Sequence, residues 1–170
     1  LWKLLNEAEV VVGHNARSFD LKKCNTKFVL YGLGSPSPYK IIDTKNEAKK
    51  YLSLPSYRLN DIADYFGLGH KIEHEGFPLW KKCIAGNRKA WKRMKQYNEQ
   101  DTKLLKEVYL KLRGFIAEPL PIPKNLKICG RCGSSKLQHR GYTMNRTTQF
   151  KRLQCRGCLG WSREKLTNIR

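Results

Sequence analysis

Six cysteines occur in the chain, and four of them form two Cys-x-x-Cys pairs, Cys129 with Cys132 and Cys155 with Cys158. A spacer of 22 residues separates the pairs. Two such pairs can supply four thiolates to one tetrahedral Zn²⁺ ion, and two strands with a turn between them would fill the spacer. The spacing therefore predicts a structural zinc site in a small domain.

These knuckles resemble those of a zinc ribbon, with Gly130, Gly133 and Gly157 at tight turns where glycine accepts positive φ. Two local disulfides or a redox pair are the other interpretations of the same spacing. Three aromatic residues of this domain are expected to form its miniature core rather than platforms for stacking bases. They are Tyr142, Phe150 and Trp161.

The chain is strongly basic, with 34 Lys and Arg against 14 Asp and Glu and a formal net charge of +20. Residues 124–170 contain twelve basic residues and one acidic residue, a net charge of +11. This balance predicts nucleic acid as the partner, because it is the commonest polyanion. The candidate nucleic-acid-binding residues of this part are Arg140, Lys151 and Arg152.

No apolar run approaches the length of a membrane span, so no membrane partner is expected. Cysteines in metal-type spacing fit a reducing cytoplasm better than a secreted disulfide framework. Pro119, Pro121 and Pro123 favour an extended, stiff linker at residues 116–127. We therefore predict a first domain at 1–115 and a zinc-ribbon domain at 128–170.

The first domain contains a strand–turn–helix pattern. The three valines at 10–12 predict a short strand covered on both faces, as in a parallel sheet flanked by helices. Gly13 ends the strand and a helix begins at Asp20, so His14, Asn15 and Asp20 lie beyond a strand end, where α/β sheets place ligands. On these residues alone Asp20 could equally be only a helix cap. The apolar face of the helix is predicted to contain Leu21, Cys24, Phe28 and Tyr31.

Further elements are predicted along the chain. Residues 39–43 fit a second buried strand, and Asp43 at its end is expected to cap the next helix. An amphipathic helix over residues 59–66 should stop at Gly67. Residues 69–78 are predicted to be an irregular loop bordering the substrate cleft.

Two helices follow this loop. Residues 79–84 predict a short helix with Trp80 facing inward and Cys83 as a small core residue. A long helix begins at Asn87, and Tyr97 and Asp101 lie one turn apart on the face it should bury. An unpaired carboxylate there would cost several kcal/mol, on the order of known buried-polar penalties, and a metal ion would remove that cost. The predicted stripe contains Met94, Tyr97, Asp101, Leu104 or Leu105, Val108 and Leu112.

The motifs Asn15-x3-Phe19-Asp20 and Tyr97-x3-Asp101 resemble the second and third motifs of the DEDD 3′–5′ exonucleases, in their tyrosine-bearing branch. The resemblance covers roughly residues 1–115 and implies an α/β, ribonuclease-H-like exonuclease fold. It implies Asp20 and Asp101 as ligands of two Mg²⁺ or Mn²⁺ ions and Tyr97 as the residue that orients the attacking water. The residues implied to position the 3′-terminal nucleotide are His14, Asn15 and Phe19.

The first motif of that family, an Asp-x-Glu on an early strand, has no counterpart in the chain. We therefore expect an N-terminally truncated sequence that lacks the first strands and two of four metal-binding carboxylates, and has little nuclease activity by itself. A natural inactive variant is the other explanation.

A basic cluster precedes and begins the long helix. It could be a solvated face or a surface that holds backbone phosphates, with Arg88 and Lys92 as candidate contacts. The cluster comprises Lys81, Lys82, Arg88, Lys89, Lys92, Arg93 and Lys95.

The sequence thus predicts a two-metal 3′–5′ exonuclease whose zinc ribbon tethers it to nucleic acid and raises the effective concentration of ends. The alternative is a non-catalytic, zinc-dependent nucleic-acid-binding protein on a nuclease-like scaffold. A transposase-type member of the same broad fold fits less well, because such enzymes have no reason to keep Tyr97 four residues before Asp101.

Overall fold

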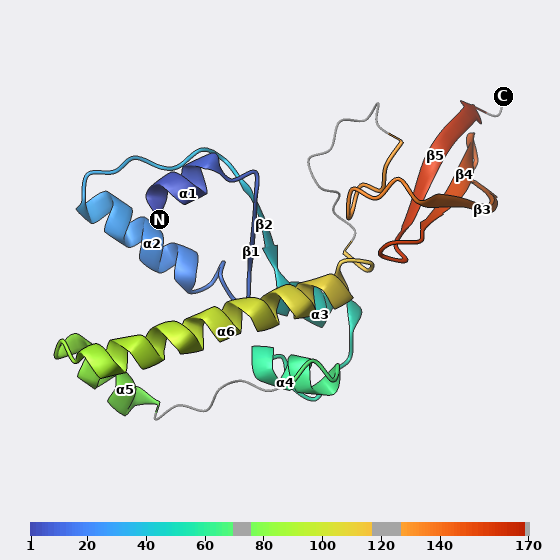
Figure 1. Ribbon diagram of the computed structural model, residues 1–170. Helices are drawn as coiled ribbons and strands as arrows, with labels where there is room; N and C mark the ends of the chain where they lie inside the picture. The colour runs from blue at the N-terminus through green and yellow to red at the C-terminus, as the bar shows by residue number, and fades with distance from the viewer. Residues whose placement is uncertain (70–75, 117–126, 169–170) are drawn as a thin grey trace. The chain divides into compact units, whose positions relative to one another are not determined.

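The computed structural model describes residues 1–69, 76–116 and 127–168 (Figure 1). The order is α1 (Trp2–Glu7), β1 (Val10–Gly13), α2 (Asp20–Leu30), β2 (Lys40–Asp43), α3 (Thr44–Tyr51), α4 (Leu59–Tyr65), α5 (Phe77–Ile84), α6 (Arg88–Leu112), β3 (Leu137–Met144), β4 (Thr148–Cys155) and β5 (Trp161–Asn168). The predicted α/β class is confirmed. Most of the predicted linker and of the loop at 69–78 lies outside the described residues.

The chain forms two compact units. The helical unit comprises Val11–Pro36 and Ile41–Tyr109. The cysteine unit comprises Leu1–Val10, Ser37–Lys40 and Leu110–Arg170. Within the described ranges, no helix is long and apolar enough to cross a membrane.

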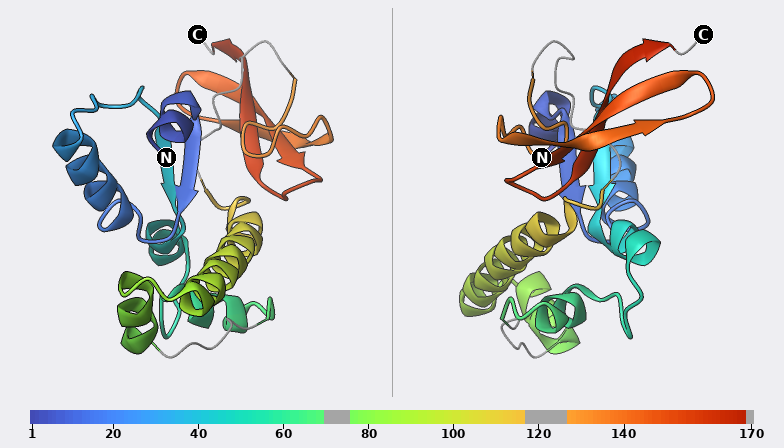
Figure 2. Two further views of the ribbon diagram at one scale, coloured as in Figure 1. Left: turned by 60° about the vertical axis from the view of Figure 1, so that its left-hand side comes forward. Right: turned by 90° about the vertical axis from the view of Figure 1, so that its right-hand side faces the viewer.

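Strands β1 and β2 lie side by side in a two-stranded sheet (Figures 1 and 2). At one end the Lys40 amide donates to the Glu9 carbonyl at 2.9 Å, and at the other the Thr44 hydroxyl donates to the Gly13 carbonyl at 3.1 Å. The pair is therefore parallel, with α2 in the crossover between the strands. The valines of β1 are half-buried, not buried as predicted, because both strands of a two-stranded sheet are edge strands.

The carboxylate of Asp43 joins the end of β2 to two other segments. It accepts hydrogen bonds from the amides of Lys45 (3.2 Å) and Asn46 (3.5 Å), so it caps α3 as predicted. It also accepts from the amides of Asn15 (2.9 Å) and Arg17 (3.1 Å) in the loop after β1. Asp43 is only 2% exposed. These bonds therefore fix the loop against the strand ends in a site shielded from water.

Helix α2 begins at Asp20, and Phe19 occupies the N-cap position without a side-chain cap hydrogen bond. Asp20 is therefore not the N-cap residue, and its carboxylate lies in the first turn, where a negative charge stabilises a helix. Leu21 and Phe28 are buried as predicted. Tyr31 is 75% exposed, contrary to the prediction, because it lies beyond the last helical residue, where the chain leaves the helical periodicity.

Helix α6 carries the predicted apolar stripe. Asn87 precedes it, and the side-chain oxygen of Asn87 accepts a hydrogen bond from the Ala90 amide at 3.0 Å, as a helix cap does. Leu104 is buried whereas Leu105 is half-buried, so Leu104 holds the stripe position. The other buried residues of the stripe are Met94, Val108 and Leu112.

Helix α5 packs through Leu79 and Cys83, which form a cluster with Ala90 and Met94 of α6. Leu79 is 1% exposed and Cys83 is 3% exposed, so the prediction for Cys83 is confirmed. Trp80 is 51% exposed, and the prediction that it faces inward is wrong. Two residues four positions apart define the buried face of a short helix, and Trp80 lies off that face.

Strands β3, β4 and β5 form an antiparallel sheet with β4 in the centre. As predicted, β3, β4 and their turn fill the spacer between the cysteine pairs. The predicted aromatic core is wrong: Tyr142 is 57% exposed and Trp161 is 42% exposed, while Phe150 is half-buried. The four converging cysteines lie at one end of this sheet, in the segment before β3, at the end of β4 and in the turn between β4 and β5.

We predict that Asp43→Ala lowers the free energy of unfolding by about 2–3 kcal/mol, because buried amides lose a charged acceptor. Urea denaturation measures this change, and Asp43→Asn should lose less because it keeps one acceptor oxygen. Glu107→Ala, at an exposed position of α6, is the control and should change stability by less than about 0.5 kcal/mol. Equal effects of the two alanine variants would contradict the prediction.

Candidate functional site

Two turns of the same geometry present the four cysteines. In the first turn the Gly133 amide donates to the Cys129 carbonyl at 2.8 Å, and in the second the Leu159 amide donates to the Cys155 carbonyl at 2.9 Å. Each turn is closed by a second bond, from the Cys129 amide to the Ser134 carbonyl and from the Cys155 amide to the Gly160 carbonyl. Backbone hydrogen bonds thus fix both Cys-x-x-Cys segments before any ligand is considered.

The residue after the second cysteine of each turn adopts the left-handed conformation, Gly133 with φ +74° and Leu159 with φ +59°. The prediction is confirmed for Gly133 but wrong for Gly130 and Gly157, which do not have positive φ. Gly157 instead allows the backbone to pass close to Ser134, because a Cβ at this position would lie 3.2 Å from Oγ of Ser134. Leucine pays a steric cost in this conformation that glycine does not.

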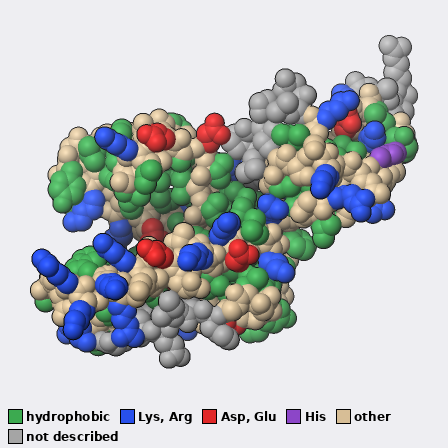
Figure 3. Space-filling model, viewed as in Figure 1, with side chains coloured by type: hydrophobic (Ala, Val, Ile, Leu, Met, Phe, Trp, Pro, Cys, Tyr) green, Lys and Arg blue, Asp and Glu red, His purple; other side chains and the backbone are tan. Residues whose placement is uncertain are grey.

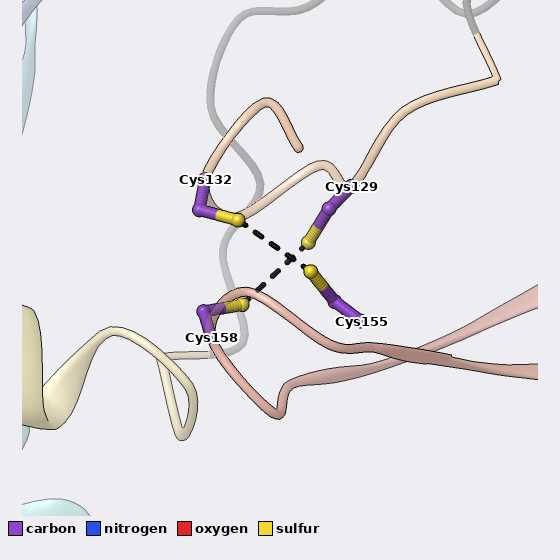
Figure 4. A group of neighbouring side chains, drawn as sticks. All are labelled: Cys129, Cys132, Cys155 and Cys158. Carbon is purple, nitrogen blue, oxygen red and sulfur yellow. Dashed lines mark hydrogen bonds between the residues drawn. The ribbon is translucent and has the colours of Figure 1, made fainter. Parts of the chain in front are cut away.

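The four sulfur atoms converge from both turns (Figure 4) and lie within 4.8 Å of one another. The Sγ atoms of Cys129 and Cys158 are 3.7 Å apart, and those of Cys132 and Cys155 are 3.6 Å apart. Four sulfurs placed about 2.3 Å from a tetrahedral zinc ion would be about 3.8 Å apart. The cluster therefore fits Zn²⁺, and the cysteines are free thiols rather than disulfides.

The surroundings of the cysteines shift the pKa values of their thiols in different directions. Burial raises the pKa of Cys155, but the amides of Cys158 and Gly157 and the neighbouring thiols outweigh it and lower this pKa to about 7. Burial and the nearby sulfurs raise the pKa of Cys158 to about 12, against the effect of the Gly160 amide. Burial likewise raises the pKa of Cys132. A bound cation would favour the thiolate form of all four residues.

The residues that resemble exonuclease motifs all belong to the helical unit. Asp20 is exposed at the first position of α2. Asp101 is half-buried on the stripe of α6, and its Oδ1 atom is fully shielded from solvent. Tyr97 is half-buried against the cluster of α5 and α6. Within the described ranges, neither aspartate belongs to a group of three or more potential metal ligands.

The loop after β1 contains His14 and Asn15, the two polar residues that were predicted to position the 3′-terminal nucleotide. Both ring nitrogens of His14 are engaged, Nδ1 with Oγ1 of Thr44 at 2.9 Å and Nε2 with the Tyr57 carbonyl at 3.1 Å. Asn15 has φ +63°, and its Oδ1 accepts from Nζ of Lys45 at 3.2 Å. Asparagine is one of the few residues that tolerate this conformation. The loop is therefore rigidly held by β2 and α3.

The other candidate contacts are exposed. The ring of Phe19 is 56% exposed, and Nζ of Lys23 lies 5.5 Å from its centre. Arg88 and Lys92 are exposed on the first turns of α6. Lys and Arg gather there and over the C-terminal sheet on the face drawn in Figure 3. In that sheet Arg140 and Arg152 are exposed and Lys151 is half-buried.

Sequence reasoning missed the contacts that hold the loop in place. The capping role of Asp43 was visible in the sequence, but its bonds to Asn15 and Arg17 join residues 26 or more positions apart. Arg17 also donates from its guanidinium to the Ile41 carbonyl at 2.9 Å. The sequence did contain a signal for these contacts, because Asp43 lies at the end of a predicted strand. Parallel strands end at the same edge of a sheet, so an aspartate there can reach the loop that follows the neighbouring strand.

The family model described as RNase_H superfamily matches residues 1–113, more than half of the chain. The chain therefore belongs to the RNase H superfamily. Members of this superfamily are generally nucleases, so the scaffold is of the nuclease type. No curated protein and no solved structure matched the chain.

We predict that the purified protein contains one zinc ion per chain. Cys158→Ser should lose the metal, whereas Cys24→Ser, at a cysteine outside the cluster, should keep it. A chelator should abolish the strand signal of the C-terminal sheet in circular dichroism and spare the helical signal, because structural zinc supplies folding energy locally. Acid should release zinc, because protons compete for thiolates.

Elemental analysis and a colorimetric zinc indicator measure both effects. A protein that contains no zinc and whose four cluster thiols are oxidised would contradict the assignment. Zinc retained equally at low and neutral pH would contradict thiolate ligation.

Proposed function

We propose that the protein is a 3′–5′ exonuclease that hydrolyses nucleic-acid phosphodiester bonds with two Mg²⁺ or Mn²⁺ ions. We propose further that the cysteine cluster is the Zn²⁺ site of a zinc ribbon that assists nucleic-acid binding. Membership of the RNase H superfamily supports the first part, and the spacing of the four sulfurs supports the second. Four thiols in such a cluster favour a reducing compartment, the cytoplasm.

The observation that carries the proposal is the position of Asp101 on α6. Its neighbours along the buried stripe are Tyr97 and Leu104, one turn to either side. A half-buried carboxylate on an otherwise apolar stripe departs from what packing alone requires, and a function in ligand binding accounts for it. Asp20, at the start of α2, follows the edge where both strands of the parallel pair end. Ligands bind at that edge in α/β sheets.

Carboxylate oxygens are the ligands that Mg²⁺ and Mn²⁺ prefer, so Asp20 and Asp101 would hold the ions. Bound ions would supply activation of water and stabilisation of the leaving oxygen. The Tyr97 hydroxyl would orient the attacking water. The 3′-terminal base would stack on the exposed ring of Phe19, and His14, with both nitrogens engaged, would position the loop.

The second candidate is a nucleic-acid-binding protein whose nuclease-type scaffold is not catalytic. It is favoured by the exposure of Asp20 and by the finding that, within the described residues, neither Asp20 nor Asp101 belongs to a group of three or more potential metal ligands. Zinc-dependent binding without hydrolysis would then be the whole activity.

We predict that the protein as encoded by its gene releases 5′-mononucleotides from 3′ ends in Mg²⁺ or Mn²⁺. Asp101→Asn should lower the rate by orders of magnitude, because it removes an anionic ligand while keeping the shape. Glu107→Gln removes the same charge at an exposed position of the same helix and should keep full activity. A protein inert with both ions and with single-stranded, duplex, DNA and RNA substrates would support the second candidate.

Melting curves of the same variants separate a ligand from a structural residue. Without metal, Asp101→Asn should be as stable as the parent or slightly more stable. In the proposed metal site the carboxylates of Asp20 and Asp101 would repel each other, and the substitution removes one of the two charges. Added Mg²⁺ should stabilise the variant less than the parent. A metal-free loss of about 1–3 kcal/mol would instead identify Asp101 as a buried hydrogen-bond partner.

A further inference from the structure

Strands β4 and β5 place two arginines directly opposite each other, Arg152 and Arg163. The Arg152 guanidinium lies 4.8 Å from the ring centre of Trp161, and the Arg163 guanidinium lies 4.6 Å from that of Phe150. Directly opposed like charges destabilise a sheet. A guanidinium stacked on a ring keeps the N–H groups at its edge available for an anion. The arrangement therefore costs stability and suits an anionic ligand.

The register shows which residues share this face. Side chains alternate along a strand, so Phe150 and Gln154 lie on the same face as Arg152. Arg140 of β3 joins them, because its Nε donates to Oε1 of Gln154 at 3.2 Å. We call this surface the arginine–aromatic face. It comprises Arg140, Phe150, Arg152, Gln154, Trp161, Arg163 and Lys165.

The charge on this face has one sign. Its four cations are all exposed, and its members include no acidic residue. Glu164 is the only acidic residue of positions 124–170, and it lies opposite Lys151 in the register, on the other face of the sheet. The face is thus complementary to a polyanion across the described part of β3, β4 and β5.

The aromatic rings of this face favour single-stranded over double-stranded nucleic acid. Trp161 is 42% exposed, so part of its surface remains open beside the arginines. A duplex stacks its bases on one another and offers proteins mainly phosphates and groove edges, whereas a single strand can stack unpaired bases on aromatic rings and guanidinium planes. Cations alternating with rings across these strands match the alternation of phosphates and bases in a single strand.

We propose that the arginine–aromatic face binds single-stranded nucleic acid. A base stacks on Trp161 and Arg152, and the phosphates contact the edges of Arg140, Arg163 and Lys165. The inference deepens the proposed function and rests on it for its purpose, because it names the form of nucleic acid that the zinc ribbon would hold for the nuclease. The binding itself does not require catalysis.

Fluorescence anisotropy of labelled oligo(dT), oligo(rU) and a duplex of equal length tests the proposal on the full chain. Trp161→Ala should weaken binding of the single strands about tenfold and leave the affinity for duplex nearly unchanged. Trp161→Phe should restore most of the loss. Arg152→Gln should reduce the slope of log affinity against log salt by about one. The deoxy and ribo probes show which sugar the face prefers.

Arg146→Gln, at an exposed position of the β3–β4 turn, removes the same charge away from this face and should change affinity less than about twofold. Zinc content verifies that each variant is folded. Single-strand affinity that Trp161→Ala leaves unchanged, or that falls in parallel with duplex affinity, would overturn the proposal even if nuclease activity is found. Trp161-dependent single-strand binding by an inert protein would support it and overturn only the exonuclease assignment.

Discussion

The carboxylate of Asp43 accepts hydrogen bonds from amides in the segments that follow both strands, β1 and β2. This one buried acceptor fixes the loop after β1, the start of α3 and the end of β2 against each other. A hydrogen bond to a charged group is stronger than one between neutral groups, and the bonds to Asn15 and Arg17 help to hold Asn15 in a conformation that few residues adopt. The position of Asp20, five residues later, depends on this anchor. A site residue on a loop is only as well placed as the contacts that hold the loop.

The C-terminal sheet belongs to a domain that is too small to be stabilised by a large apolar core. A domain of about 40 residues buries too little apolar surface to be stable by packing alone. Four cysteines from two turns of equal geometry converge at one end of the sheet, and a bound ion would supply the missing stability. Two of the three aromatic side chains expected in the core of this domain, Trp161 and Phe150, instead pair with arginines.

The residues that could be predicted from the sequence are those governed by local periodicity. The stripe of α6, the cap at Asp43 and the cysteine turns follow from spacing along the chain, and the structure confirms them. Predictions failed where the outcome depends on what packs against a side chain. Trp80 was assigned to the core because it is large and apolar, yet Leu79 and Cys83 supply the packing face of α5. Tyr142 and Trp161 were assigned to a core for the same reason, and the structure leaves both exposed. The roles of Asp20, Tyr97 and Asp101 remain predictions.

The central claim is that Asp20 and Asp101 bind divalent cations for phosphodiester hydrolysis. Anomalous scattering from crystals of the protein grown with Mn²⁺ tests it most directly, because the signal locates the ion itself. The account predicts a manganese peak beside the carboxylates of Asp20 and Asp101, together with a zinc peak among the four cysteines as an internal control. A zinc peak with no manganese at either aspartate would contradict the nuclease site and leave a zinc-dependent nucleic-acid-binding protein.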